Sequence, residues 1–512
     1  MAIEGLERRN IILGFSILFS KGIPLKYMFS IAGKKAESAQ YNVHFINEIK
    51  DIDKSSYSAE IKTALKAQVD KKGFECKNGQ IISFEVLSGK DVKTYLMVAV
   101  ANLTDLEQMR RAAASASRFL RQDKTKKYGV FVSFAFEITE GHLTSLVEGF
   151  RLTAYSFSKY KKTPSLPDSQ VAVTVSSDLS TNAATNAIKK GEVNCNAVYF
   201  AKDLINESPS ELYPESLGAI LKKEFKNSKV KVQVHDTTWL KKNKMGGILA
   251  VGQGSVKKPV LIEMTYKPNK AKKHIVLVGK GVTFDSGGLS IKVGGGMIWM
   301  KMDMSGAAAV SGAMKIISES NANVQVTVLI PAVENMPDGN AYRVDDVLRM
   351  ADGSTVEVNN TDAEGRLILA DALFWASKMK PDSIIDVATL TGACVVALGN
   401  WTAGMFSNNN AVAEKLIAAS SATGEKIARL PLDQDLSDNL KSYLADQKNT
   451  TGGGPEGGAI IAGLFLEKFV KETPWGHLDI AGTMKTPDSH LFDGGGVAFG
   501  VRLLADYTIN QA

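Results

Sequence analysis

Cysteine is scarce in this sequence of 512 residues, and the three that occur, Cys76, Cys195 and Cys394, lie far apart and form no CxxC pair. A disulfide framework is therefore not expected, and a reducing compartment is favoured. A strong charge of one sign is also missing, because 61 lysines and arginines against 54 aspartates and glutamates leave a formal net charge of +7. Over this length, so small an excess does not indicate a nucleic-acid-binding protein.

A membrane-spanning segment is missing near the N-terminus, where the apolar run at residues 11–19 falls short of the about 20 residues that a bilayer requires. Residues 20–22, Ser-Lys-Gly, are a poor cleavage site for a secretory signal, and Glu4 and Glu7 are unusual in a mitochondrial presequence. We expect this run to be a strand or an extension packed on the N-terminal domain. The cytoplasm is the expected location, with mitochondria as the less favoured alternative.

Several motifs of common enzymes are absent. The sequence contains no HExxH, no GxSxG, and no Gly-Lys pair followed by Ser or Thr, so the helix of many zinc proteases, the nucleophile elbow and the P-loop are excluded. The six histidines are scattered, with no two at ligand spacing. A metal site in this chain would have to be built from carboxylates.

The composition, 44% hydrophobic and 22% charged, is that of a globular chain. Apolar runs alternate with helical spacings, which predicts an α/β fold. We expect an N-terminal α/β domain at residues 1–180, a linker helix at 181–208 and a larger C-terminal α/β domain at 209–512. In the larger domain a central, mainly parallel mixed sheet should be flanked by helices, with functional loops at the carboxyl ends of its strands. The expected strands are 95–101, 130–136, 260–265, 274–279, 324–330 and 383–389, and the expected helices are 105–121, 183–207, 305–318 and 366–379.

Two segments combine carboxylates, lysines and glycines at strand ends. The first, residues 278–303, supplies Lys280, Asp285, Lys292 and Asp303. The second, residues 360–366, supplies Asp362 and Glu364, which would share one face if the segment is extended. Two carboxylates on one face repel unless a cation lies between them. Any one of these residues alone would be read as a solvated surface group, but their combination favours a metal site.

The string Asn360-Thr-Asp-Ala-Glu-Gly-Arg-Leu367 matches the signature of the leucine aminopeptidase (cytosol aminopeptidase) family of dinuclear zinc exopeptidases, which the chain closely resembles. Residues 280–292, 334–343, 389–393 and 477–482 are also similar to segments of that family. The resemblance is strong over about residues 200–512, whereas the first 180 residues match in general plan alone.

The resemblance implies two divalent metal ions held by Lys280, Asp285, Asp303, Asp362 and Glu364. Asp285 and Glu364 would contact both ions, Asp362 would complete the more exchangeable site, and Lys280 and Asp303 would complete the tighter one. Zinc is the implied metal, and manganese, magnesium and cobalt stay open for the exchangeable site. Lys280 would have to be deprotonated to bind a metal.

The catalytic residues that the resemblance implies are Lys292 and Arg366. Lys292 would stabilise the developing oxyanion. Arg366 would hold a bicarbonate ion that acts as general base, helped by main-chain groups near Ala363, Gly365 and Leu390.

The family's pocket for the first substrate side chain corresponds to residues that are apolar or small, namely Met300, Thr389, Gly392, Ala481 and Met484. Such a pocket suits leucine or methionine with some breadth. Without the resemblance, Met300 and Met484 would be read as core residues. The glycine-rich segments 449–458 and 493–497 leave the shape of the substrate subsites open.

The implied function is that of a metallo-aminopeptidase, which releases leucine and other apolar residues from peptides with a free N-terminus by attack of a metal-activated water. A cytoplasmic homohexamer without membrane or nucleic-acid partners is expected. The alternative is a catalytically reduced structural or nucleic-acid-binding member of the same fold.

Overall fold

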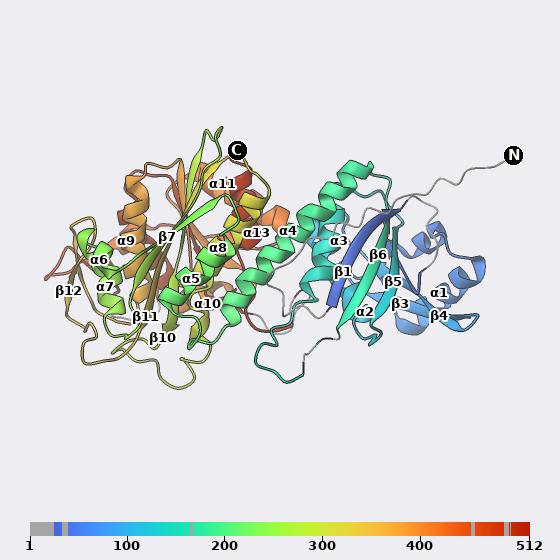
Figure 1. Ribbon diagram of the computed structural model, residues 1–512, viewed down its shortest axis with the longest axis horizontal. Coiled ribbons are helices and arrows are strands. Elements are labelled where there is room, and N and C mark those ends of the chain that lie inside the picture. Colours follow the sequence, from blue (N-terminus) through green and yellow to red (C-terminus); the bar gives the residue numbers. More distant parts are fainter. Residues whose placement is uncertain are drawn as a thin grey trace. The chain divides into compact units, whose positions relative to one another are not determined.

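The computed structural model describes residues 25–32, 39–163, 166, 168–451, 456–485, 491 and 493–512, so the apolar run at residues 11–19 lies outside the described part. The chain divides into two compact units, Met1–Cys195 with Asp488–Asp493, and Asn196–Pro487 with Gly494–Ala512. The division falls inside one long helix, α4 (Thr181–Asn206). Both units combine strands and helices, which confirms the expected α/β fold (Figure 1).

The first unit is built on a sheet that has six described strands in the order β1-β6-β5-β2-β4-β3. Neighbouring strands are parallel except for β3 and β4. Apolar residues of the sheet, such as Val43, Val130 and Val173, pack with Leu143 and Phe150 of α3 in one buried core. The strands are β1 (Leu25–Ala32), β2 (Tyr41–Ile46), β3 (Ile81–Ser88), β4 (Asp91–Ala99), β5 (Lys127–Phe134) and β6 (Ser169–Ser176), and the helices are α1 (Ala59–Lys72), α2 (Leu106–Leu120) and α3 (Glu140–Leu152), with the 3-10 helix η1 (Ile49–Lys54).

The second unit is built on a larger mixed sheet. Its described strands follow the order β16-β15-β18-β14-β9-β11-β8-β7, and β10 pairs with β11. The strands β18, β14, β9 and β11 are parallel to one another, and β10 is parallel to β11. The strands are β7 (Val230–His235), β8 (Val260–Tyr266), β9 (His274–Gly279), β10 (Gly281–Asp285), β11 (Gln325–Asn335), β14 (Ser383–Ala388), β15 (Ala403–Ser407), β16 (Ile427–Arg429) and β18 (Trp475–Asp479).

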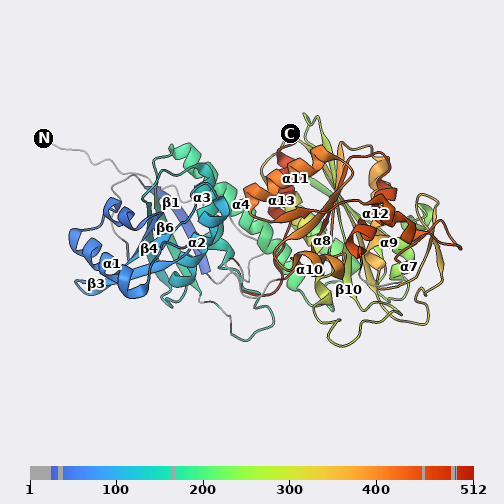
Figure 2. The same cartoon turned by 180° about the vertical axis from the view of Figure 1, so that it is seen from behind.

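Helices cover both faces of this sheet (Figure 2). On one face α9 (Glu364–Lys378) packs with α7 (Gly246–Gly252) and α12 (Gly458–Val470), and Val276 and Val278 of β9 belong to their core. On the other face α8 (Ser305–Glu319) packs against β9, β14 and α13 (Val501–Ile509). The remaining elements are α5 (Pro214–Glu224), α6 (Thr237–Lys242), α10 (Gly392–Leu398), α11 (Asn410–Thr423), η2 (Met300–Met302), η3 (Gln434–Leu440) and a small sheet of β12 (Val347–Arg349), β13 (Thr355–Glu357) and β17 (Gln447–Lys448).

The parallel strands bring chemically active residues to one edge of the sheet. The strands β9, β10, β11, β14 and β18 end at Gly279, Asp285, Asn335, Ala388 and Asp479. Because they are parallel, their carboxyl ends lie together, and ligand sites of such sheets lie at this edge. Among the described helices, none has both the length and the apolar character that crossing a bilayer requires.

Candidate metal centre

Lys280 follows β9 directly and lies buried at the centre of the site. Its Nζ donates to the carbonyl oxygen of Thr389 at 2.8 Å and forms ion pairs with Asp303 at 2.8 Å and Glu364 at 2.9 Å. Gly365 makes room for this side chain, because a Cβ there would lie 2.6 Å from Cε of Lys280. The lysine therefore joins carboxylates from two distant segments of the chain.

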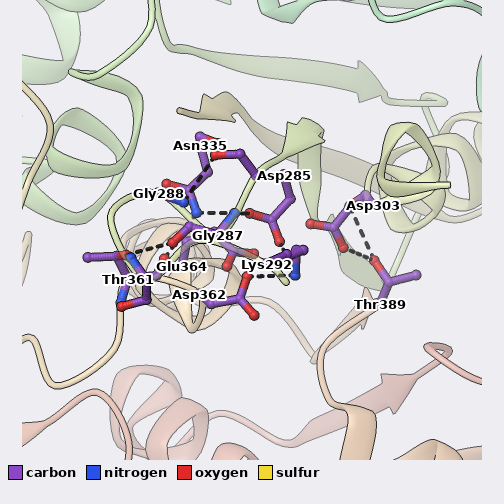
Figure 3. A network of polar contacts seen from close by, with 12 residues as sticks. Asp285, Gly287, Gly288, Lys292, Asp303, Asn335, Thr361, Asp362, Glu364 and Thr389 are labelled. Atoms are coloured by element: carbon purple, nitrogen blue, oxygen red, sulfur yellow. Dashed lines mark hydrogen bonds and ion pairs between the residues drawn. The ribbon is translucent and has the colours of Figure 1, made fainter. Parts of the chain in front are cut away.

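Asp285 is the last residue of β10, and its carboxylate is held from several sides (Figure 3). Oδ1 accepts from the backbone N–H of Gly287 and from Nδ2 of Asn335, both at 2.9 Å. Oδ2 forms an ion pair with Lys292 at 2.8 Å. Gly287 has a φ of +89°, and a Cβ there would lie 2.5 Å from the carbonyl oxygen of Ser290. Glycine is therefore required at this turn.

The sequence-based expectation that Asp362 and Glu364 lie on one face of an extended segment is wrong. Oδ1 of Asn360 accepts from the N–H of Asp362 at 2.8 Å, and its carbonyl accepts from the N–H of Ala363 at 3.2 Å. These bonds form a turn, because an asparagine side chain can bond to the backbone two residues on. Glu364 is already the first residue of α9. Asp362 instead forms an ion pair with Lys292 at 2.6 Å.

Asp303 follows η2, just ahead of α8, and completes a compact group of carboxylates. Its Oδ1 accepts from Oγ1 of Thr389 at 2.6 Å. Asp303, Asp285 and Glu364 are all buried, and one carboxylate oxygen of each lies within 4.8 Å of the others. Ligand atoms at this mutual distance are close enough to bind one metal ion.

The pattern of unused oxygens fits a cation. Within the described part of the chain, Oδ2 of Asp303 and Oε2 of Glu364 are buried and have no hydrogen-bond partner. Buried polar atoms are almost always paired, so such atoms point to a missing ligand. The carboxylates of Asp285, Asp303, Asp362 and Glu364 also outnumber the two lysines that contact them. Carboxylate oxygens together with one amine nitrogen are donors that suit a divalent metal.

Burial and mutual repulsion shift the protonation of these groups. Burial, reinforced by the charges of Asp285 and Asp303, raises the pKa of Glu364 to about 8 against the attraction of Lys280. Burial likewise raises the pKa of Asp303 to about 6, despite Lys280. The pKa of Asp362 is raised by burial and by Asp285, while Lys292 acts in the opposite direction. A bound cation would relieve this repulsion and displace the protons.

The two lysines face the carboxylates differently. Burial alone would lower the pKa of Lys280 and that of Lys292, but the neighbouring carboxylates outweigh it and raise both above the usual range. Lys292 is the more accessible, with 16% of its side chain exposed against 4% for Lys280. Of the two lysines, Lys292 is therefore the one more open to a bound molecule.

Arg366 lies buried in the first turn of α9. Its Nη1 donates to the carbonyl oxygen of Asn449 at 2.8 Å, while its Nε has no partner among the described residues. Burial lowers the pKa of Arg366 to about 10, although Glu364 and Asp479 act against it. A buried guanidinium with a free N–H beside a helix N-terminus can hold an anion. Of the backbone groups expected to help, the N–H of Leu390 donates to Asp479 at 3.1 Å.

The expected pocket residues occupy three places. Thr389 and Gly392 follow β14, and Ala481 follows β18, the strand beside it. The N–H of Ala481 donates to Asp479 at 3.2 Å, so these two loops meet at that carboxylate. Met300 and Met484 are half-buried, the first in η2 and the second in a loop after β18.

The structure adds residues that the sequence did not single out. Asn335 links Asp285 to the carbonyl oxygen of Thr361 at 3.0 Å. The hydroxyl of Tyr342 donates to the same carbonyl at 2.6 Å, and Oγ1 of Thr361 donates to the carbonyl oxygen of Gly287 at 2.6 Å. These contacts fix the second carboxylate segment against the first. Asn335 and Tyr342 lie in the family-like segment 334–343 and Thr361 in the signature 360–367, but neither resemblance indicates these contacts.

Comparison with known proteins agrees with this geometry. The model of the catalytic domain of the cytosol aminopeptidase family matches residues 199–505, and the model of its N-terminal domain matches residues 46–164. A protein of Persephonella marina named as a probable cytosol aminopeptidase is 39% identical over 447 residues, which are 86% of this chain and 89% of the relative. A protein of Rhizobium etli with the same name is 38% identical over 500 residues, 96% and 97% of the two chains.

The chain belongs to the cytosol aminopeptidase family. The expected resemblance is thereby confirmed, and the chain is a metallo-aminopeptidase in the broad sense of that family. A solved structure of the bottromycin maturation enzyme BotP in complex with Mn is also similar, with a TM-score of 0.81 and 31% identity over 93% of this chain and 100% of BotP. The two family models match residues in both units, so each unit has a counterpart in the family.

Proposed function

We propose that this protein releases N-terminal amino acids, preferably leucine and other apolar residues, from peptides with a free N-terminus. The observation that carries the proposal is the buried group of Asp285, Asp303 and Glu364, which have one oxygen each within 4.8 Å of the others. Two of these carboxylates have an oxygen without a partner among the described residues. A buried carboxylate cluster at the carboxyl edge of a parallel sheet has the position of a catalytic centre. Membership of the cytosol aminopeptidase family supports the reaction class.

Five residues would hold two divalent ions in this proposal: Lys280, Asp285, Asp303, Asp362 and Glu364. When bound, such ions polarise the scissile carbonyl and lower the pKa of the attacking water. Lys280 would ligate as a neutral amine, because an ammonium has no lone pair to donate. Zinc, with manganese, magnesium or cobalt at the exchangeable position, fits the mixed oxygen and nitrogen donors.

Two cations of the chain would act on the substrate side. Lys292, whose Nζ lies 2.8 Å from Asp285, would stabilise negative charge that develops on the carbonyl oxygen. Arg366, through its free Nε, would hold a bicarbonate ion together with main-chain groups near Ala363, Gly365 and Leu390. When bound, that ion would supply a general base.

The preference for leucine rests on the pocket formed by Met300, Thr389, Gly392, Ala481 and Met484. These residues are small or apolar, so a branched aliphatic side chain would find no unpaired polar group. Methionine side chains adapt their shape, so methionine and other apolar residues should also be accepted.

The test is hydrolysis of leucine p-nitroanilide by the full-length protein, before and after a chelator and again after manganese or zinc is restored. We expect loss of activity with the chelator and recovery with the metal. A chelated protein of unchanged activity would contradict the metal-dependent mechanism. No hydrolysis of any unblocked peptide would favour a catalytically reduced member of the fold.

Blocking the substrate amine gives a second test, because the proposal assigns the free amino group to the metal centre. We expect N-acetyl-leucyl peptides to be resistant where leucyl peptides are cleaved. Comparable cleavage of both would indicate an endopeptidase or an amidase.

The cytoplasmic location and the homohexamer belong to the same proposal. Sedimentation of the purified chain, which has a mass of 55.1 kDa, would give about six times that mass for the hexamer. A monomer or dimer that is fully active would remove the hexamer from the proposal.

A further inference from the structure

A fully buried carboxylate lies at the carboxyl edge of the larger sheet, where β18 ends. Asp479 is the last residue of β18 and is 0% exposed. Its Oδ1 accepts from three backbone N–H groups, those of Leu390 at 3.1 Å, Thr391 at 3.4 Å and Ala481 at 3.2 Å. Its Oδ2 accepts from Oγ1 of Thr391 at 2.6 Å.

These contacts join the two loops that carry the proposed pocket. Leu390 and Thr391 lie in the loop after β14, between Thr389 and Gly392, and Ala481 lies in the loop after β18. Oγ1 of Thr391 also accepts from the N–H of Cys394 at 3.0 Å and so caps α10, whose first residue is Gly392. One carboxylate thus fixes the backbone on both sides of the pocket.

All these contacts are donors to Asp479, so they favour an anionic side chain at this position. A neutral apolar residue at this position would leave the N–H groups of the buried Thr391 and of the half-buried Leu390 and Ala481 without this acceptor. Charge-assisted bonds to backbone N–H groups are about twice as strong as neutral ones. These bonds restrain both loops at one carboxylate.

We propose that Asp479 is a positioning residue that determines substrate specificity, because it fixes Thr389, Gly392 and Ala481 in the arrangement that admits a leucine side chain. This role rests on the proposed function. It assigns to Asp479 no contact with the substrate and no part in metal binding.

Two variants of different severity test the role. Asp479→Ala removes every acceptor and should loosen both loops. Asp479→Asn keeps the shape and one acceptor oxygen, and its amide can donate to Oγ1 of Thr391, so it should retain part of the effect. We expect the ratio of kcat/KM for leucine amide to that for alanine amide to fall about tenfold or more in Asp479→Ala, the scale on which pockets discriminate side-chain size. The fall should be smaller in Asp479→Asn.

A matched control exists in the same unit. Asp371 of α9 is also 0% exposed and accepts backbone N–H groups, from Ile248 at 3.0 Å and Ala351 at 2.8 Å. Neither partner lies in the site. Asp371→Asn should leave the leucine-to-alanine ratio within about twofold of the parent, which separates positioning from a general loss of stability.

Two further readouts complete the experiment. Metal content by elemental analysis should equal that of the parent in all three variants. Hydrogen exchange of segments 389–394 and 478–483 should be faster in both Asp479 variants and unchanged in Asp371→Asn. If Asp479→Ala does not fold, the ratio and the exchange of Asp479→Asn decide alone.

The outcomes are distinguishable. A parent protein that releases no amino acid from any unblocked substrate overturns the proposed function, and the specificity role falls with it. An active parent whose Asp479 variants slow leucine and alanine substrates by one common factor overturns the specificity role alone. Unchanged exchange in both segments also overturns it.

Discussion

Each of the two units buries a network of charged side chains, and the two networks differ in whether all their carboxylate oxygens are paired. In the first unit Arg110, which is 3% exposed, contacts Glu107 and Glu148. The other oxygen of Glu107 accepts from Arg111 at 2.8 Å, and the other oxygen of Glu148 accepts from Asn194 at 2.7 Å. Every carboxylate oxygen of this described network has a protein partner.

The network of the second unit stays open. Oδ2 of Asp303 and Oε2 of Glu364 are buried and, within the residues that the structure describes, lack a partner. The first network lies between helices α2, α3 and α4, whereas the second lies at strand ends beside glycines that admit close backbone approach. A buried charge cluster in which every polar atom is paired stabilises the fold. A buried cluster with unpaired polar atoms indicates a ligand-binding site.

The largest effect should follow removal of a carboxylate from the open network. Asp362→Ala and Glu364→Ala should each lower kcat/KM by more than about a hundredfold, because even a residue that only supports a metal ligand costs 10–100-fold. Both should also bind less metal by elemental analysis. Glu148→Ala, in the closed network, is the control and should keep the metal content. A Glu364→Ala protein with two metals per chain would contradict the ligand role.

Replacing either cation, Lys292 or Arg366, should lower the rate by a comparable factor but leave the metal content unchanged. Lys292→Ala should lower kcat by about 10²–10³, the usual cost of one donor to a developing oxyanion. Arg366→Ala should lower kcat by about 10²–10⁴, the usual worth of a general base. KM should change much less in both. Added bicarbonate should stimulate the parent and not Arg366→Ala, and an equal response of the two would show that the division of roles is wrong.

The closed network should respond in stability and not in rate. Arg110→Met leaves Glu107 and Glu148 buried without their cation, and breaking a buried pair in this way costs about 3–5 kcal/mol. Urea unfolding should show that loss, while metal content and kcat/KM of the folded protein stay near those of the parent. An Arg110→Met protein with unchanged stability and a large fall in kcat/KM would show that the two networks do not differ in this way.

Local patterns in the sequence predicted the strand that precedes Lys280 and the helix that follows Asp303. The expected strand at residues 274–279 is β9, and the helix expected at 305–318 is α8 to within one residue. Their apolar residues predicted both elements. The strands expected at 95–101 and 130–136 end two residues earlier, as β4 and β5, because their last apolar residues belong to the following loops.

Contacts between distant strands could not be predicted in this way. Asn335 meets Asp285 because β11 lies beside β10, and Asp479 meets Leu390 because β18 lies beside β14. Both neighbour relations follow from the order of strands in the sheet, which no local pattern contains. The turn at Asp362 was missed for a local reason, since the side chain of Asn360 bonds to the backbone and competes with an extended chain.

Asp371 combines features of the two networks, and its effect should appear as a dependence of stability on pH. It is fully buried and has backbone N–H partners but no ion pair among the described residues, and burial raises its pKa from 3.8 to about 7 although those N–H groups act in the opposite direction. A raised folded-state pKa means that the folded protein binds this proton more tightly than the unfolded chain. The stabilisation is therefore complete below pH 4 and is lost as the pH rises to about 7. Relative to Asp371→Asn, which does not titrate, the free energy of unfolding of the parent should fall by up to about 1.4 kcal/mol per pH unit across that window. Urea unfolding of both proteins in the presence of a chelator measures the difference, and parallel curves from pH 4 to 7 would show that the N–H groups keep Asp371 ionised.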